Sequence, residues 1–447
     1  MTPPVVRTTR SVAWVAALTV IGYSVVRGRD LQQREPRIWL GAAPLVGRDR
    51  IDGWDWRFGG GLMLAGVILA LVVAATHRDW WSSARTVAVY TASGLGAMSF
   101  AVALALTDGA DGIRYGVAHR TEYLANLPAM PPAGEFVRTF VERIDDYSVH
   151  VRGHPPGFPL LLKALDAVGL GGVWPAAALS IVATGIATAA VLAVAARIAG
   201  ATSMRRAAPF LVVCPYLIWM VSSADAVYTA AGAVGTAAVA MGAGRSPRRA
   251  AAFGFAGGLV LGALLFGTYL GAVFMIVPAI VGGYSVARRR LGAITTALTA
   301  AAGAAAVVVG FRLAGFWWLD GVRRTNEEYW AGSAQFRPSG YFAVANLAAA
   351  LIALGPATFA GLTRLRPGRV WLVVGGALLA VAASDLSQYT RAEVERIWLL
   401  FFPWVAIAAA GLAAGAVGAA RRHRATWWLF AQGAGAIVLQ AALVSKW

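Results

Sequence analysis

The sequence YSVHVRGHPPGFP at residues 147–159 marks the boundary between a long polar segment and a chain that is afterwards almost entirely apolar. It contains two histidines four residues apart, a double proline that cannot continue a helix, and a glycine. The stretch therefore predicts a rigid polar corner at the edge of a hydrophobic domain. The composition of the flanking regions identifies the class of that domain.

The composition is that of an integral membrane protein. Of 447 residues, 58 % are hydrophobic and only 13 % are charged, and the mean hydropathy is +0.64, well outside the range of soluble domains. Long apolar runs are separated by short arginine-rich links. In lipid, only helices and closed barrels satisfy their own backbone hydrogen bonds. The runs are continuous rather than alternating, so they predict helices.

We therefore expect an all-α polytopic membrane protein with about thirteen transmembrane helices, counted as apolar runs long enough to cross the bilayer. The first run follows Arg7 and Arg10 and lacks a small-residue cleavage site, so it is expected to remain as an uncleaved span. The predicted spans are residues 11–26, 59–76, 86–107, 173–197, 207–222, 226–242, 250–267, 270–287, 292–315, 344–363, 370–384, 398–419 and 426–443.

The arginine clusters predict the orientation of these helices. Basic links alternate with links that lack such clusters, and the positive-inside rule assigns the basic links and the N-terminus to the cytoplasm. The basic links contain residues 205–206, 245–249, 288–290, 364–369 and 421–424. The outer face then carries residues 108–157, 223–225, 267–271, 316–343 and 385–397. The arginine-rich loop 28–57 also falls on the outer face, against the rule.

The net charge of +18 is spread over these links instead of forming one basic domain, so nucleic acid is not an expected partner. Cys214 is the only cysteine, which excludes an intramolecular disulfide and a cysteine-based metal site. The near absence of lysine indicates a GC-rich, bacterial source. No linker divides the chain, so we expect one domain, residues 1–447, in which a two-span extension (1–85) precedes a core (86–447).

Two short interfacial helices are expected around the long outer loop 108–157. Apolar residues between Phe136 and Ile144 recur at helical spacing opposite charged ones, which indicates an amphipathic helix. The apolar run 158–170 contains Lys163 and Asp166 and is too short to span a membrane, so it predicts a second interfacial helix.

The outer loop also holds the first candidate site residues. Asp111 and Glu122 could each accept a proton from a hydroxyl group or hold a cation, and the alternative is that each is a solvated loop acid. His150 and His154 have a spacing that suits a metal on a helix, but Gly153 and the prolines argue against a helix here, and no third ligand lies nearby. A hydrogen-bonding corner is the preferred interpretation.

These features together resemble the GT-C superfamily of membrane glycosyltransferases. Protein O-mannosyltransferases of this superfamily carry an acidic residue in the first large outer loop and a His-Pro-Pro-Leu motif a few tens of residues later. His154, Pro155 and Pro156 match that motif, with Gly157 in place of leucine. Glu122, upstream of the motif, is the acid best placed to be the catalytic carboxylate.

Asp111 is the alternative acid, because the sequence DGIRY at 111–115 resembles the aminoarabinose transferase branch, although Gly112 replaces its expected second acid. The sequences around Glu122, His154, 315–321 and 393–399 also resemble an uncharacterised group of actinobacterial integral membrane proteins with GT-C character. The resemblance covers residues 90–440 approximately, and the first two spans have no counterpart in it.

Two further polar segments carry candidate residues. Arg391, Glu395 and Arg396 precede a late span, where an arginine suits the two-donor binding of a phosphate, and interfacial snorkelling is the alternative. Asp320 and Asn326 lie among aromatic residues that suit stacking on sugar rings, and an interfacial aromatic belt is the alternative.

Asp225 and Tyr269, at two outer turns, are lesser candidates. An acid near the membrane boundary is costly enough to suggest a function, and a helix cap is the alternative interpretation of Asp225.

The resemblance implies an enzyme that transfers a sugar, mannose or a pentose, from a polyprenyl-phosphate donor to a hydroxyl group of a glycan, lipid or protein, with inversion. It places this reaction at the outer face of the bacterial cytoplasmic membrane. The implied proton acceptor is Glu122 or Asp111. The implied phosphate-binding residues are Arg396, Arg391, His154 and His150, and the substrate-binding residues are Asp225, Tyr269, Asp320, Asn326 and Glu395.

No metal site and no firm cofactor are expected, and a divalent cation is left open. The rival class is a transporter or flippase of a lipid-linked or anionic envelope precursor, and a third is a membrane scaffold without activity. Transporters usually show related halves with broken helices near the middle of the membrane. The concentration of polar residues at one surface favours the enzyme.

Overall fold

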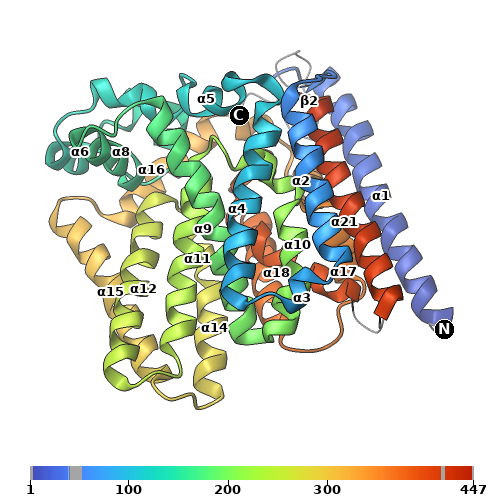
Figure 1. Ribbon diagram of the computed structural model, residues 1–447. Helices are drawn as coiled ribbons and strands as arrows, with labels where there is room; N and C mark the ends of the chain where they lie inside the picture. Colours follow the sequence, from blue (N-terminus) through green and yellow to red (C-terminus); the bar gives the residue numbers. More distant parts are fainter. Residues whose placement is uncertain (1–3, 39, 41–52, 414–417, 445–447) are drawn as a thin grey trace.

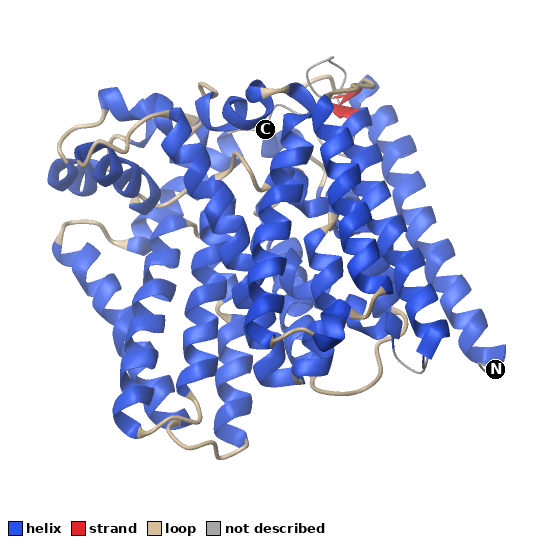
Figure 2. Ribbon diagram, viewed as in Figure 1, coloured by secondary structure: helices blue, strands red, loops and turns tan. Residues whose placement is uncertain are grey.

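The computed structural model describes residues 4–38, 40, 53–413 and 418–444. The described chain is almost entirely helical (Figure 2). Ten of its helices are long and apolar enough to cross a membrane, or eleven if one bent pair counts as a span. The predicted class of an all-α, multi-pass membrane protein is therefore confirmed, whereas the predicted number of thirteen spans is not.

The ten membrane-crossing segments lie in α1 (Pro4–Arg34), α2 (Gly60–His77), α4 (Thr86–Ala105), α9 (Val173–Ala199), α11 (Ala224–Gly242), α12 (Pro247–Gly267), α13 with α14 (Leu270–Phe274, Ile276–Ala287), α15 (Ala293–Leu313), α17 (Ser339–Leu362) and α18 (Val370–Ser387). The other α-helices are α3 (Trp80–Ser83), α5 (Ala110–Ala118), α6 (Ala133–Thr139), α7 (Val149–Arg152), α8 (Gly157–Ala167), α10 (Ala201–Val212), α16 (Trp318–Ala331), α19 (Val394–Ile397), α20 (Phe402–Ala406) and α21 (Gly418–Ala442).

The remaining elements are 3-10 turns and one small strand pair. The turns are η1 (Leu106–Asp108), η2 (Tyr123–Ala129), η3 (Ile144–Asp146), η4 (Pro215–Trp219), η5 (Ser333–Phe336), η6 (Trp398–Leu400) and η7 (Ile407–Ala413). The antiparallel strands β1 (Gly53–Trp54) and β2 (Leu443–Val444) pair near the two ends of the chain.

Three of the predicted spans account for the difference in number. The prediction of a span at 207–222 is wrong, because α10 ends at Val212 and Pro215, which has no backbone N–H to continue the helix, begins η4. The predicted span 398–419 is a bent pair, with an angle of 78° at Phe401, and its residues 414–417 lie outside the described chain. The predicted span 426–443 falls in α21, which is not among the ten.

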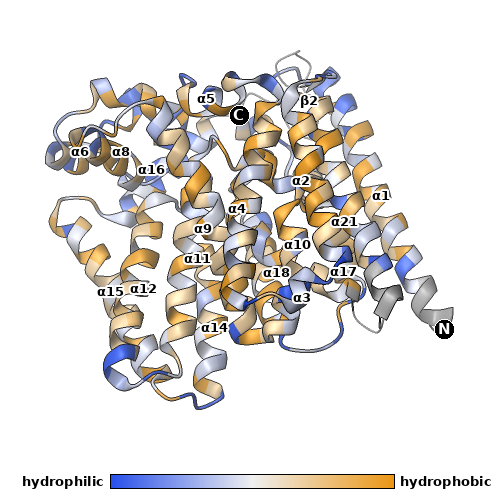
Figure 3. Cartoon of the chain, in the orientation of Figure 1, coloured by the Kyte–Doolittle hydropathy of each residue, from blue (hydrophilic) through white to orange (hydrophobic). Residues whose placement is uncertain are grey.

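The long helices run side by side, and several short ones, among them α5, α6, α8 and α16, gather at one end of the bundle (Figure 1). The N-terminal end of α1 and the basic links after α11 and α14 lie at the opposite end. Figure 3 shows mostly apolar helices between two more polar ends. The segregation of arginine-rich links from the long loop 108–157, predicted from the sequence, is thus reproduced by the fold.

The two predicted extension helices pack on the last part of the chain. Trp14 of α1 meets Phe359 of α17 edge to face, with ring centroids 4.7 Å apart, and the Tyr341 hydroxyl donates to the Ser24 carbonyl at 2.7 Å. On α21, Gly433 lets Leu69 of α2 approach, because a Cβ at this position would lie 2.4 Å from the leucine side chain. The described part of residues 1–85 therefore packs directly against the rest of the helical bundle.

Short helices lie at both positions where interfacial helices are predicted, one within the loop 108–157 and one at its end. Phe136, Phe140 and Ile144 are fully buried, but α6 ends at Thr139 and the chain continues as turns, so the first helix is shorter than expected. The second is α8, with its apolar residues on one side. Phe158 of α8 and His154 of the polar corner both pack against Tyr123, with ring centroids 4.8 and 5.8 Å from it.

Candidate functional site

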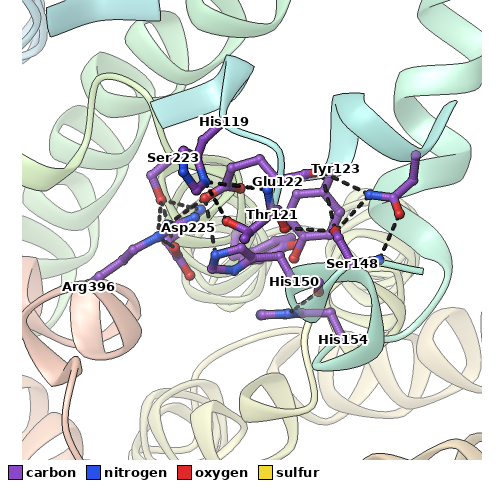
Figure 4. Close-up of polar contacts among 12 residues, drawn as sticks. His119, Thr121, Glu122, Tyr123, Ser148, His150, His154, Ser223, Asp225 and Arg396 are labelled. Atoms are coloured by element: carbon purple, nitrogen blue, oxygen red, sulfur yellow. Dashed lines mark hydrogen bonds and ion pairs between the residues drawn. The ribbon is translucent and has the colours of Figure 1, made fainter. Parts of the chain in front are cut away.

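A charged network lies inside the end of the bundle where the short helices gather (Figure 4). Arg396 donates through one terminal nitrogen to Glu122 Oε1 at 2.7 Å and through Nε to Asp225 Oδ2, also at 2.7 Å. Arg396 and Glu122 are each no more than 5 % exposed. We call Glu122, Ser223, Asp225, Arg396 and the adjacent His150 the charged network. Its members come from three segments that are far apart in the sequence.

Local structure explains the position of Asp225. Ser223 is the N-cap of α11, and its hydroxyl accepts from the Asp225 backbone N–H at 3.0 Å. The same hydroxyl donates to Asp225 Oδ2 at 2.6 Å and accepts from Arg396 Nε at 3.2 Å. A carboxylate in the first turn of a helix is also stabilised by the helix dipole. The cap interpretation and the functional interpretation of this turn are thus compatible.

The two histidines of the polar corner line the network. His150 Nε2 lies 3.4 Å from Glu122 Oε1. His154 Nδ1 lies 2.9 Å from the His150 carbonyl oxygen, and because a carbonyl only accepts, Nδ1 must carry the hydrogen. Burial lowers the pKa of both imidazoles, and the nearby Arg396 charge lowers the pKa of His150 further. Both rings are therefore neutral at pH 7.

Hydrogen bonds between loops hold Glu122 next to His150. Asn126 donates to the Glu122 carbonyl at 2.9 Å and to Ser148 Oγ at 2.7 Å, and its own amide oxygen accepts from Ser148 N at 2.8 Å. The Ser148 hydroxyl donates to the Thr121 carbonyl at 2.7 Å. Sequence reasoning missed Asn126 and Ser148. Only the position of Ser148 just before α7, where cap residues are favoured, could have indicated it.

Two tyrosines form a wall beside the histidines. The hydroxyls of Tyr123 and Tyr228 lie 3.1 Å apart, and the His154 ring stacks on Tyr228 with centroids 5.8 Å apart. Burial raises the pKa of Tyr123 well above its usual value. The tyrosines are therefore neutral hydrogen-bonding groups that add aromatic surface beside His154.

The segment that carries Arg396 has an unusual backbone. Gln388, Ala392 and Glu393 all have positive φ angles, of 65°, 74° and 62°. Such residues are strained and persist only where the surroundings hold them. Here Asn346 donates to Asp385 at 2.8 Å and to the Thr390 carbonyl at 2.6 Å and accepts from Ala392 N at 3.1 Å. The strained turn is thus fastened to α17 and α18 just before Arg396.

The predicted phosphate-binding Arg391 belongs to this supporting structure. Its guanidinium donates to the carbonyls of Arg337 and Ala334 at 2.6 and 3.4 Å and to the Gln388 side chain at 3.2 Å. It also lies 4.6 Å above the Trp330 ring. Arg337 in turn donates to the Arg391 carbonyl at 2.6 Å. The contacts of Arg391 therefore hold the loop, and they are separate from those of the charged network.

The remaining candidates are distributed around the network. Asp111 is exposed and pairs with Arg114 at 2.6 Å, and the exposed Asp320 lies 3.5 Å from Arg323. In the described part of the chain, neither forms an ion pair or hydrogen bond with the network's charged groups. The structure thus brings together Glu122, His150, Asp225 and Arg396, with His154 beside them, and leaves Asp111 and Asp320 at the surface.

Three further candidates lie neither in the charged network nor at the surface with Asp111 and Asp320: Tyr269, Asn326 and Glu395. Tyr269 packs against Trp318 with ring centroids 5.5 Å apart, and burial raises its pKa. Asn326 lies on α16, which an ion pair of 3.0 Å between Glu328 and Arg152 connects to α7. Glu395 is 1 % exposed and directly precedes Arg396. Among the described residues, no three His, Cys, Asp or Glu side chains converge as metal ligands.

The chemical character of the site follows from its charges. Two carboxyl groups share a single guanidinium, and the histidines beside them are neutral. Removal of one partner from a buried ion pair destabilises a protein by about 3 to 5 kcal/mol, because the other charge stays buried without compensation. Protonation of either carboxylate would therefore weaken its electrostatic attraction for the Arg396 guanidinium.

The fold and site define a multi-pass, all-α membrane protein with a buried ionic network at one end of its helices. Comparison with known proteins adds no relative: no family model, no curated protein and no solved structure matches this chain.

Proposed function

We propose that the protein is a polyprenyl-phosphate-sugar-dependent glycosyltransferase of the GT-C type. The observation that carries the proposal is the buried ion pair network of Glu122, Arg396 and Asp225, assembled at the ends of helices beside the His-Pro-Pro corner. A transferase of this kind needs a proton acceptor for the attacking hydroxyl and a cation for the departing phosphate. Glu122 and Arg396 are groups of these two types in direct contact.

The geometry suggests how the two roles are coupled. The acceptor hydroxyl oxygen attacks the anomeric carbon as the bond between that carbon and the phosphate oxygen breaks, and the hydroxyl proton passes to Glu122. Protonation of Glu122 weakens its attraction for Arg396 at 2.7 Å. The guanidinium charge then becomes available to the lipid phosphate that leaves. Asp225 keeps Arg396 in place from the other side throughout this exchange.

Glu122 is preferred over Asp111 as the proton acceptor. Asp111 is exposed and paired with Arg114 on the surface of α5, where water screens its charge. Glu122 is buried against His150 and Arg396. The proposed location is the bacterial cytoplasmic membrane, with the arginine-rich links in the cytoplasm and the charged network at the outer face.

The first test is transfer of radiolabelled mannose or pentose from a polyprenyl-phosphate donor to membranes that contain the purified protein. The variant Glu122→Gln keeps the shape of the side chain and should reduce transfer by at least about a hundredfold, the usual contribution of an acid–base group. The matched control Asp111→Asn should transfer like the wild type. Full activity of the Glu122 variant would exclude this residue as the proton acceptor.

A transporter of an anionic, lipid-linked precursor is the second candidate, and one observation favours it. Helix α17 is interrupted at Gly355, whose φ of 73° and ψ of 171° are not helical, and is followed there by Pro356. Broken helices inside the membrane are common at the substrate sites of transporters. Reconstitution into liposomes separates the candidates, since movement of the labelled lipid across the bilayer without sugar transfer would favour transport.

A further inference from the structure

A groove on the membrane-facing surface lies between α2 and α21, away from the charged network. The two helices run beside one another, with α1 on the far side of α21 (Figure 1). The groove has a volume of about 680 Å³. It is lined by Gly66, Leu69, Ala70, Val73, Ala74, His77 and Arg78 of α2 and its C-cap, and by Phe430, Ala434, Ile437 and Val438 of α21.

The lining is apolar along the groove and cationic at one end. Nine of its eleven residues carry no charge or hydrogen-bonding side chain, and the two that do, His77 and Arg78, are neighbours at the end of α2. Both are exposed. No hydrogen bond or ion pair joins the Arg78 guanidinium to another side chain in the part of the chain that the structure describes. The adjacent Asp79 is the one acid next to it in the sequence.

The dimensions match one leaflet of a bilayer. Gly66 and Arg78 are twelve residues apart along a helix, which corresponds to a length of about 18 Å. Half of a hydrocarbon core is about 15 Å thick. Tryptophans mark the cationic end as a membrane interface, since Trp80 and Trp81 come two and three residues after Arg78. Trp427, which is 62 % exposed, lies on α21 three residues before the first lining residue, Phe430.

We infer that this groove binds one anionic phospholipid, with an acyl chain between α2 and α21 and the phosphate at Arg78 and His77. The apolar length fits a single chain, and the guanidinium supplies the charge complement that a lipid phosphate requires. The inference does not depend on the proposed enzymatic function.

The same geometry argues against the groove as the site of a polyprenyl-phosphate substrate. The C-terminal end of α2, which Arg78 caps, lies at the end of the bundle that holds the N-terminal end of α1 and the basic links, whereas the short helices around the charged network lie at the opposite end (Figure 1). A lipid whose phosphate contacts Arg78 therefore has its head group in the other leaflet. The expected ligand is a resident lipid of the arginine-rich side.

The test uses the full-length protein, stripped of lipid in detergent and titrated with dioleoyl phosphatidylglycerol or dioleoyl phosphatidylcholine. Bound lipid is counted by native mass spectrometry. The wild type should prefer phosphatidylglycerol. Arg78→Gln should lower the affinity for phosphatidylglycerol about fivefold, the factor expected for one basic side chain at a lipid surface, and leave phosphatidylcholine binding unchanged.

Variants that fill the groove provide a second test of lipid binding. A Cβ at Gly66 would meet no atom within 4 Å, so Gly66→Leu adds its side chain to open space, and this variant should lose binding of both lipids. Gly310→Leu on α15 is the matched control, because its position is equally open. Ala70→Phe blocks the same groove and replaces Gly66→Leu if that variant fails to fold.

Three results would overturn the inference. Equal binding of phosphatidylglycerol by the wild type and both groove-filling variants would show that the lipid sits elsewhere. An unchanged lipid preference in Arg78→Gln would remove the phosphate contact. A dimer that Gly66→Leu dissociates would show that the groove receives a helix of a second copy instead of a lipid.

Discussion

Comparison of two buried polar clusters in the described part of the bundle shows that they differ in charge and in the groups that their side chains bind. The charged network joins Glu122 and Asp225 to Arg396 at the ends of helices. The second cluster, which we call the neutral node, consists of Cys214, Gly355, Thr358 and Gln432. In the neutral node, Gln432 accepts from the Ala357 backbone N–H at 2.8 Å and donates to the Leu354 carbonyl, also at 2.8 Å.

The neutral node satisfies backbone hydrogen-bonding groups at an interruption of α17. Gly355 interrupts α17, and the amide group of Gln432 satisfies one donor and one acceptor that the interruption exposes. The Cys214 thiol lies 3.1 Å from Gln432 Nε2, where α10 has ended and η4 begins. Unpaired backbone N–H and C=O groups are energetically costly in lipid, so the neutral node has a structural purpose.

The charged groups of the network pair with each other and do not complete a broken backbone, although Ser223 also caps α11. Well-packed apolar residues in place of a buried ion pair are often neutral or stabilising. A costly arrangement that the fold does not need is a better candidate for function than one that completes a helix. This difference is the reason to place the proposed chemistry at Arg396 and not at Gln432.

The largest effect should follow from removing the central cation. Arg396→Met leaves Glu122 and Asp225 buried without a partner and should lower the free energy of unfolding by about 3 to 5 kcal/mol. Chemical unfolding in detergent, followed by tryptophan fluorescence, measures this loss. Arg248→Met, at an exposed position, is the control.

A triple variant then separates stability from function. Arg396→Met combined with Glu122→Gln and Asp225→Asn removes all three charges and should recover most of the lost stability while sugar transfer stays abolished. Failure of the triple variant to regain stability would mean that the network is needed for folding, and the contrast with the neutral node would disappear.

The backbone of the neutral node is expected to be nearly as sensitive. Gly355→Ala places a side chain at a φ of 73°, which costs about 1 to 3 kcal/mol, and its Cβ would lie 2.6 Å from the Gln432 amide oxygen. Thermal unfolding should show the loss. The control is Gly310→Ala in the regular helix α15. The added Cβ would meet no atom within 4 Å there, so this variant should be neutral or slightly stabilising.

The side chain of the node should affect stability without affecting transfer. Gln432→Leu leaves the Ala357 N–H and the Leu354 carbonyl unpaired and should destabilise the protein by about 1 to 3 kcal/mol, while the folded fraction retains the wild-type transfer rate. Gln440→Leu, on the same helix, tests for the general effect of losing an amide. A lost transfer rate in stable Gln432→Leu protein would instead give the node a functional part, as in a transporter.

The smallest predicted effect is a dependence of stability on pH. The imidazole of His150 faces Glu122, Asp225, Arg396, His154 and Glu393, and burial keeps its pKa well below the usual 6.5. Below pH 6.5 the unfolded chain therefore binds a proton that the folded chain excludes. Stability is present above this pH and falls as the pH decreases, by up to about 1.4 kcal/mol per pH unit.

His150→Gln should reduce this slope between pH 7 and pH 5, measured by unfolding at a series of pH values. His423→Gln, at an exposed site, should leave the slope unchanged. An identical slope in His150→Gln and the wild type would indicate that the imidazole is charged in the folded protein.

Parts of the site could be predicted from residue types alone. An acid in a long polar loop, a His-Pro-Pro corner and an arginine before a late span were each recognisable, and Glu122, His150, Asp225 and Arg396 do meet. The residues that hold them were not recognisable, because Asn126, Ser148 and Asn346 are ordinary polar residues until their partners are known. The role of Arg391 was also hidden, since its partners are mainly backbone carbonyls.

The sequence by itself determined the membrane class, the helical architecture and the separation of the basic links from the long polar loop. These properties follow from hydropathy and charge, which act along short stretches of chain. Only the tertiary structure decided which of the candidate acids is buried against Arg396, that α10 ends early and α17 is interrupted, and where a groove opens between α2 and α21. Those outcomes depend on contacts between segments hundreds of residues apart, as in the pairing of Glu122 with Arg396, and no local pattern encodes them.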